Sequence, residues 1–367
     1  MKLLFLGSYT DLKPQHYTEK GNGQGLYIYR IQLDQSGLPR SLNLATVLEC
    51  WNPVYFAFNQ DKTFLYVANE GDKPEQNAIS VYKIDNLAEC QFSLVSRVPV
   101  RGRWCCYITA FEDLVMVANY KSGSAMAFVG AKTGDLKEIW FEQYTGGANL
   151  VPGRQECAKA HSAVVNPKTR LVHVADLGND CLYIYTIGSE NEKFGNSKRK
   201  LKMSPASGPR TVEVHPSGKF VYIACELSNQ VLALSEDLKP IQEPVSTLTD
   251  NPNNHFSYSE SYQCLSELKV SPDGRFLYVS NRGVKNSLAI FAVNQESGAL
   301  SPIGCQSSRG AVPRNFAIDS SGDWLIVANQ DSENLTVFQI DKQTGKLAFN
   351  GLSFKAATPV GIEILDC

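Results

Sequence analysis

Six polar residues of this chain are of types that could carry out acid–base chemistry on an anionic molecule: His161, Arg210, Glu226, Arg282, Arg314 and Gln330. An imidazole exchanges protons near neutral pH, so it suits a general base or a general acid. A guanidinium group binds phosphate or carboxylate through forked donors. All six residues lie at two fixed offsets from one repeated strand pattern, which predicts that they gather in one place.

The repeated pattern is a short apolar strand that ends in a small or polar residue. The last residues of its copies, taken as anchors, are Ser8, Asn69, Asn119, Asp176, Cys225, Asn281 and Asn329, with successive gaps of 61, 50, 57, 49, 56 and 48 residues. A period near 50 residues that is built only from strands is typical of the blades of a β-propeller.

Turn chemistry and the two ends of the chain support the same fold. The turns at 215–218, 271–274 and 319–322 end in glycine, which accepts the positive φ of a tight hairpin. The segment 359–362 resembles the first strand of a blade, and the N-terminal copy lacks that strand. We therefore predict an all-β, seven-bladed β-propeller that forms a single domain over residues 1–367. Its ring is closed by the C-terminal strand, which joins the N-terminal blade.

The register of the repeat places two sets of side chains near the propeller axis. Fifteen residues before five of the anchors, on the innermost strand, lie Val54, His161, Arg210, Ser266 and Arg314. One residue after six of the anchors lie Glu70, Tyr120, Leu177, Glu226, Arg282 and Gln330. Charged groups that converge must be paired or solvated, because an isolated buried charge is very costly. A polar cleft at one mouth of the channel is the expected result.

For each of these residues a structural role competes with a functional one. A pair such as Arg210 and Glu226 could simply link two blades, since propeller channels are usually wet. The anchors themselves fit the capping of strand ends. A histidine, a glutamate and several arginines on one side of the ring, taken together, favour a functional site.

Composition and charge argue against several classes of protein. The chain is 43% hydrophobic and 20% charged, and its net charge is −2. No global field would therefore draw it to nucleic acid or to a membrane surface. The apolar run at residues 3–6 is shorter than the roughly 7–15 residues of a secretory signal core, and no run approaches the roughly 20 residues of a membrane span. Ten cysteines without CxxC pairs or metal-ligand spacing predict reduced thiols, a cytoplasmic protein and no metal or other cofactor.

At this point several motifs together resemble one family. They are 160–162 (AHS), 208–210 (GPR), 226–229 (ELSN), 266–268 (SEL), 271–283 (SPDGRFLYVSNRG) and 328–332 (ANQDS). The chain is similar over almost its whole length to the seven-bladed β-propeller lactonase family. That family includes propeller-type 6-phosphogluconolactonases, carboxy-muconate lactonizing enzymes and 3-carboxymuconate cyclase-like proteins.

The resemblance implies a metal-independent lactonase that opens a sugar-acid lactone, with 6-phosphogluconolactone as the expected substrate. By resemblance, His161, Arg210, Glu226 and Arg282 match the catalytic positions. His161 would act as general base or acid, and Glu226 would orient the imidazole or share the proton transfer. The two arginines would bind the phosphate or carboxylate of the substrate and stabilise developing negative charge.

Further residues are predicted to bind the substrate: Arg154, Gln155, Lys159, Glu267, Arg314 and Gln330. Residues 154–159 are expected on a loop that enters the same mouth. Two departures from the family pattern stand out, because Cys225 occupies a position where many relatives carry asparagine, and Glu213 replaces an apolar residue of an inner strand.

Two other functions compete with the lactonase. A muconate-type cycloisomerase would use the same arginines for the carboxylates of its substrate. A non-catalytic propeller would bind a protein partner through its faces and would not need the polar set at the axis. The expected partner is a small anionic lactone, and the expected assembly is a monomer or a weak homo-oligomer.

Overall fold

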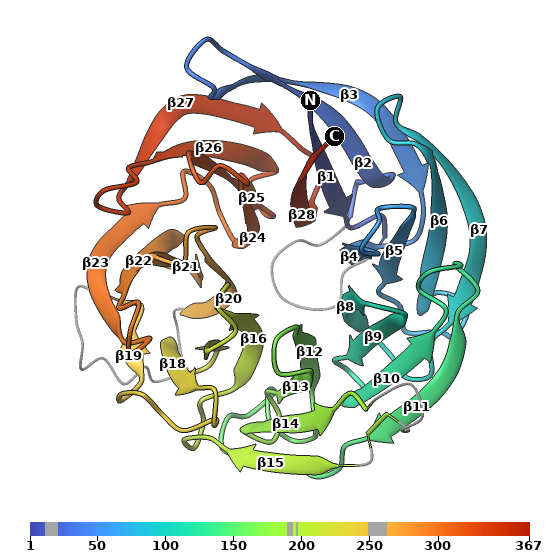
Figure 1. Cartoon of the computed structure of the whole chain (residues 1–367), viewed down its shortest axis with the longest axis vertical. Helices are drawn as coiled ribbons and strands as arrows, with labels where there is room; N and C mark the ends of the chain where they lie inside the picture. Colours follow the sequence, from blue (N-terminus) through green and yellow to red (C-terminus); the bar gives the residue numbers. More distant parts are fainter. Residues whose placement is uncertain (12–20, 189–193, 196, 249–262) are drawn as a thin grey trace. The chain divides into compact units, whose positions relative to one another are not determined.

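The computed structural model describes residues 1–11, 21–188, 194–195, 197–248 and 263–367, and every regular element within these ranges is a β-strand. The strands form seven four-stranded sheets (Figure 1). This number and size of sheets confirms the predicted all-β, seven-bladed β-propeller. The described ranges contain no helix that is long and apolar enough to cross a bilayer.

The sheets follow one another along the chain, apart from the sheet that contains both termini. That sheet has the order β28 (Pro359–Asp366), β1 (Lys2–Ser8), β2 (Gly25–Leu33), β3 (Pro39–Glu49). The next two are β4 (Pro53–Phe58), β5 (Phe64–Asn69), β6 (Ala78–Asn86), β7 (Gln91–Pro99), and β8 (Cys105–Phe111), β9 (Leu114–Asn119), β10 (Ser124–Val129), β11 (Lys137–Gln143).

Four more sheets complete the set. They are β12 (Ala160–Asn166), β13 (Leu171–Asp176), β14 (Cys181–Thr186), β15 (Lys198–Lys202), then β16 (Pro209–Val214), β17 (Phe220–Cys225), β18 (Gln230–Ser235), β19 (Val245–Ser246). The last two are β20 (Gln263–Val270), β21 (Phe276–Gly283), β22 (Ser287–Val293), β23 (Leu300–Ser307), and β24 (Pro313–Ile318), β25 (Trp324–Asn329), β26 (Asn334–Ile340), β27 (Leu347–Lys355).

The described residues divide into two compact units. Unit 1 comprises Met1–Asn52, His215–Ala224 and Ser228–Cys367, and unit 2 comprises Pro53–Val214 and Cys225–Leu227. Within unit 2 the first strands β4, β8, β12 and β16 pack against one another in that order, and within unit 1 β20, β24 and β28 do the same. The single domain over residues 1–367 stays a prediction.

The anchors of the repeat coincide with the ends of the second strands. Ser8, Asn69, Asn119, Asp176, Cys225 and Asn329 are the last residues of their strands, and Asn281 lies two residues before the end of β21. Both β9 and β25 are buried at every position. A strand that is buried on both faces reads as a continuous apolar run, which is why the copies were recognisable in the sequence.

The two ends of the chain share one sheet, as predicted. β28 pairs antiparallel with β1, from Lys2 opposite Asp366 to Ser8 opposite Pro359. The Lys2 ammonium lies 2.7 Å from the buried carboxylate of Asp319 and 2.5 Å from that of Asp366. The pairing therefore joins the termini through both backbone and side-chain contacts.

The predicted turns also have the expected geometry. Gly218, Gly274 and Gly322 have φ values of 78°, 78° and 72°, a region that only glycine enters at little cost. The amide of each glycine donates to the carbonyl three residues earlier, at 2.7–2.8 Å. These hairpins set the register between the first and second strands.

The first strands carry a recurrent β-bulge that the sequence did not reveal. In unit 2 an extra residue interrupts the pairing of β4 at Val54, of β8 at Cys106 and of β12 at His161. In unit 1 the bulge recurs in β24 at Arg314. A bulge redirects a side chain away from the regular alternation of the strand. It is the backbone feature that gives His161 its position.

His173 is fully buried in the middle of β13, and it generates a prediction about stability. Burial lowers the pKa of His173 to about 4 from an ordinary value of 6.5, and nearby Arg199 acts in the same direction. The unfolded chain binds a proton at this histidine between those pH values and the folded chain does not, so stability falls as the pH falls through that window.

We expect the unfolding free energy of the wild type to decrease by up to about 3 kcal/mol through His173 between pH 7 and pH 4. Urea unfolding at several pH values would measure this in the wild type and in His173→Leu. The variant should show a flatter dependence on pH. Parallel curves for the two proteins would contradict the assignment.

Candidate active site

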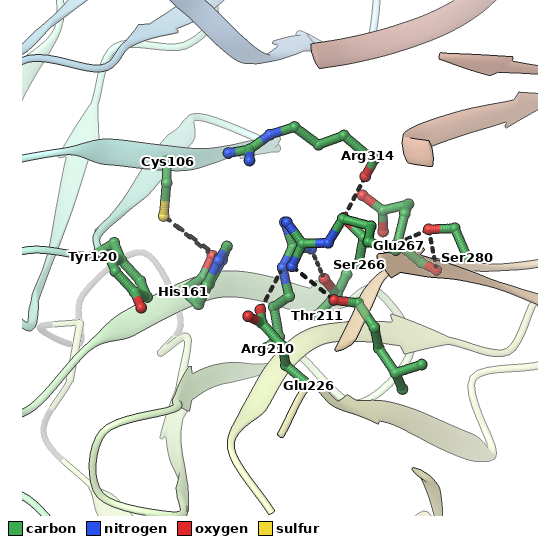
Figure 2. Close-up of polar contacts among 12 residues, drawn as sticks. Cys106, Tyr120, His161, Arg210, Thr211, Glu226, Ser266, Glu267, Ser280 and Arg314 are labelled. Atoms are coloured by element: carbon green, nitrogen blue, oxygen red, sulfur yellow. Dashed lines mark hydrogen bonds and ion pairs between the residues drawn. The ribbon is translucent and has the colours of Figure 1, made fainter. Parts of the chain in front are cut away.

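Unit 2 contains three of the four predicted catalytic residues and three of the six predicted binding residues, Arg154, Gln155 and Lys159. His161 and Arg210 are the second residues of β12 and β16, and Glu226 follows the last residue of β17. Arg154 lies on the loop between β11 and β12. Figure 2 shows Arg210 between Thr211 and Glu226, and Cys106 against His161.

The centre of this group is a carboxylate held by two guanidinium groups. Oε1 of Glu226 accepts a hydrogen bond from Nη2 of Arg154, and Oε2 lies 3.0 Å from Nε of Arg210. Arg154, Arg210 and Glu226 are only 9%, 6% and 2% exposed. Two cations and one anion leave this buried triad with a formal charge of +1. Guanidinium groups held in this way can bind a phosphate or carboxylate through their forked donors.

His161 is held by two neighbours in unit 2. Sγ of Cys106 lies 3.8 Å from Nδ1 of His161 and donates to the carbonyl oxygen of the same residue at 3.4 Å. The ring of Tyr120 meets the imidazole edge to face, with centroids 5.0 Å apart.

Arg154 is fixed by its loop as well as by Glu226. Nη2 of Arg154 also donates to the hydroxyl of Tyr120 at 3.4 Å. The loop packs through Val151 on a small apolar cluster with Leu177 and Leu227, against which Tyr120 also lies. The guanidinium is therefore positioned before any ligand arrives.

Gln155 lies in the scaffold under the site. Its side chain is fully buried, and Nε2 donates to the carbonyl of Leu177 at 2.9 Å and to Oδ1 of Asp180 at 2.8 Å. Asp180 also accepts from the amides of Ala206 and Gly208, at 2.8 and 2.7 Å. One buried carboxylate thus ties the loop of Arg154 to the segment that leads into Arg210.

Lys159 is half-buried and lies two residues before His161. Its ammonium is 5.1 Å from the centre of the Tyr120 ring. Its backbone amide donates to Oδ1 of Asp176 at 2.7 Å. Burial raises the pKa of Asp176 although this amide and Asn179 donate to it. The anchor residue of the repeat therefore holds the backbone from which the lysine projects.

The other predicted site residues belong to unit 1. Arg282 is buried in β21, and its Nη2 donates to the carbonyl of Leu265 at 2.8 Å. Glu267 is buried in β20, where its backbone amide donates to Oγ of Ser280 at 3.0 Å (Figure 2). The guanidinium of Arg314 lies 5.4 Å from the centre of the Tyr9 ring, and Nε2 of Gln330 donates to Asp331 at 3.1 Å.

Three residues of the unit 2 group were not predicted: Cys106, Tyr120 and Asp180. Cys106 is the second residue of β8 and matches His161 in β12, but it lies thirteen rather than fifteen residues before its anchor because the hairpin is shorter. Tyr120 lies in the predicted ring with Glu226, but a phenol at that position does not by itself indicate a role in the site. Asp180 gave no signal, since an aspartate in a turn is common.

Known proteins place the chain in a family. The family model of the lactonases with a seven-bladed β-propeller matches residues 3–364. This chain belongs to that family. The predicted resemblance is confirmed, and with it the enzyme class, a lactonase that acts on a cyclic carboxylic ester.

Curated relatives and a solved structure match over nearly their full lengths. A 6-phosphogluconolactonase of Formosa agariphila is 33% identical over 353 residues, 94% of each chain, and one of Bacillus subtilis is 32% identical over 371 residues, 98% of this chain and 97% of its own. The periplasmic gluconolactonase of Pseudomonas aeruginosa superposes with a TM-score of 0.84 at 26% identity, covering 100% of this chain and 99% of its own.

The scaffold around Asp180 generates a prediction. Asp180→Ala removes the acceptor of two backbone amides and of Gln155, so we expect a loss of about 2–4 kcal/mol in unfolding free energy. Lactonase activity should fall at least about tenfold, since Gly208 and Arg210 lose their support.

Urea unfolding and lactone hydrolysis would be measured on the same preparations. Asp135→Ala is the matched control, because Asp135 is exposed in the β10–β11 hairpin and should change stability by less than about 0.5 kcal/mol. Unchanged stability of Asp180→Ala would contradict the scaffold role.

Proposed function

We propose that this lactonase hydrolyses 6-phosphogluconolactone, or a closely related anionic sugar-acid lactone, at the unit 2 group of residues. The observation that carries this proposal is the buried triad of Arg154, Glu226 and Arg210, whose two aligned guanidinium groups suit an anionic substrate and an anionic transition state. The names of the two curated relatives supply the substrate class.

His161 carries the proton in the proposed mechanism. Its imidazole takes a proton from a water molecule as the water oxygen attacks the lactone carbonyl carbon. The carbonyl π electrons move to oxygen, and a guanidinium of the triad stabilises that charge. When the intermediate collapses, the bond to the ring oxygen breaks, and the imidazolium returns its proton to the leaving alkoxide.

Glu226 acts as a positioning residue in this mechanism. Both of its oxygens contact guanidinium groups, which favours the alignment of Arg154 and Arg210 over the orientation of the imidazole or a share in the proton transfer. Arg282 remains proposed as a catalytic arginine, and Glu267, Arg314 and Gln330 as substrate-binding residues, on the sequence resemblance alone.

Lys159 is proposed to bind the substrate phosphate. An ammonium on a half-exposed flexible stem is a common point charge for phosphate. Its position two residues before His161 on the same chain segment would place that charge beside the reacting ester. Gln155, by contrast, is proposed to support the loop that carries Arg154 through its hydrogen bonds to Leu177 and Asp180.

The remaining expectations form part of the same proposal. The triad supplies the positive charge that a metal could otherwise provide, so we propose a reaction without metal or other cofactor. We also propose a cytoplasmic protein, a monomer or a weak homo-oligomer, that acts in carbohydrate metabolism and binds neither nucleic acid nor membranes.

The proposed roles of His161 and Glu226 can be separated by kinetics. Proton release from fresh 6-phosphogluconolactone would be followed above the spontaneous rate for wild type, His161→Gln and Glu226→Gln. We expect His161→Gln to lower kcat by about 10²–10⁴. Glu226→Gln should lower kcat by about 10–10². It should not remove the decrease of kcat at acidic pH, which is expected where the base His161 becomes protonated.

Each outcome of that experiment bears on one statement. No acceleration by folded wild type would overturn the substrate assignment. If the decrease of kcat at acidic pH disappeared in Glu226→Gln, proton transfer would be assigned to the carboxylate. Full activity of His161→Gln would remove the imidazole from the mechanism.

The phosphate role of Lys159 predicts a change in specificity. We expect Lys159→Met to raise KM for 6-phosphogluconolactone by about tenfold and to leave KM for unphosphorylated gluconolactone nearly unchanged, because only the former loses an ion pair. Lys168→Met, at an exposed turn between β12 and β13, serves as the control. An equal rise of KM for both substrates would contradict a phosphate contact.

A further inference from the structure

Tyr120 occupies the same structural position as Glu226 in a different blade. Each residue directly follows the anchor of its second strand, Asn119 in β9 and Cys225 in β17. The backbone amide of Tyr120 donates to the carbonyl of Trp104 at 2.8 Å, and that of Glu226 donates to the carbonyl of Gly208 at 2.8 Å. The repeat therefore presents both side chains from equivalent backbone.

The phenol of Tyr120 connects His161 with the triad of Arg154, Glu226 and Arg210. Its ring contacts His161 edge to face, and its hydroxyl accepts from Arg154, which in turn binds Glu226. The ring also lies parallel to that of Trp104, with centroids 6.1 Å apart. These contacts hold the hydroxyl in one place between the imidazole and the triad.

The hydroxyl of Tyr120 has a proton to offer. A phenol can both accept and donate a hydrogen bond, and here the acceptor side is used by Arg154. Burial raises the pKa of Tyr120, with the Arg154 guanidinium opposing that shift, so the phenol is protonated at neutral pH. The hydroxyl proton must then point away from Arg154.

We propose that Tyr120 is a further catalytic residue, whose hydroxyl donates a hydrogen bond to the carbonyl oxygen of the lactone as that oxygen becomes negative. The inference rests on the proposed function of the same site. Tyr120 transfers no proton in this step, because the proton lost by the attacking water goes to His161 and from there to the leaving ring oxygen. The phenol and the guanidinium behind it share the charge of the oxyanion.

The arrangement makes Tyr120 a better donor than an isolated tyrosine. Positive charge on Arg154 polarises the phenol toward donation, and the link from Arg154 to Glu226 prevents that cation from moving toward the substrate itself. A donor that is aligned before the reaction needs no reorganisation as charge develops. Removal of one such donor typically costs about 10²–10³ in kcat.

The first test is Tyr120→Phe, assayed on 6-phosphogluconolactone beside the wild type. We expect kcat to fall by about 10²–10³ with KM changed less than about threefold. Tyr183→Phe is the matched control, because Tyr183 is a buried tyrosine of β14 in the same unit, packed on Tyr144 and outside the site. Full activity of Tyr120→Phe in a wild type that hydrolyses the lactone would overturn the inference and leave the proposed function standing.

A second test distinguishes catalysis from packing and applies even if Tyr120→Phe folds poorly. Site-specific 3,5-difluorotyrosine at position 120 keeps the hydroxyl and lowers its pKa. If the hydroxyl donates to the substrate, kcat should gain a new dependence on pH and fall as the fluorinated phenol ionises. A pH profile identical to that of the wild type would assign Tyr120 to packing and overturn its catalytic role. If the wild type itself fails to accelerate hydrolysis of this lactone, the proposed function fails first.

Discussion

The structure of the unit 2 group depends on one constraint, the burial of two guanidinium groups around a single carboxylate. Removal of Arg154, Arg210 and Glu226 from water costs several kcal/mol per charge, and only close, well-aligned contacts offset that cost. The three side chains come from a loop, from a first strand and from the residue after a second strand. Much of the surrounding detail serves this alignment. Asp180 ties the loop to the segment before Arg210, and the carbonyl of Gly208 holds the backbone of Glu226.

The repeat explains how such a site can arise from a uniform scaffold. Four blades share a bulged residue in the first strand: Val54, Cys106, His161 and Arg314. In unit 2 the residues that directly follow the second strands are Glu70, Tyr120, Leu177 and Glu226. The amides of Tyr120, Leu177 and Glu226 each donate to the carbonyl of the residue just before the first strand of the same blade. Different side chains are therefore presented from equivalent backbone.

The contrast between a repeated backbone and varying side chains also explains what could be predicted from the sequence. Apolar runs such as 324–329 are buried on both faces, and their spacing fixed the number of blades and the pairing of the two ends. A constant count of fifteen residues located His161 and Arg210, but it failed at Cys106, where the hairpin is two residues shorter. Loops have no sequence period. The hydrogen bond from Arg154 to Glu226 and the one from the buried Gln155 amide to Leu177 could therefore not be predicted from the repeat. Contacts between loops depend on tertiary packing, which local pattern does not encode.

The contacts of the triad also favour His161 over Glu226 as the group that moves the proton in the proposed reaction. If Glu226 took up a proton, two buried guanidinium groups would lose the carboxylate charge that they share, and breaking such a buried ion pair is costly. His161 lies against the thiol of Cys106 and the phenol of Tyr120, and it holds no guanidinium group in the contacts described above. In the proposed mechanism the imidazole therefore moves the proton and the carboxylate stays between its two guanidinium groups. Such a site would separate the work of holding charge from the work of moving a proton.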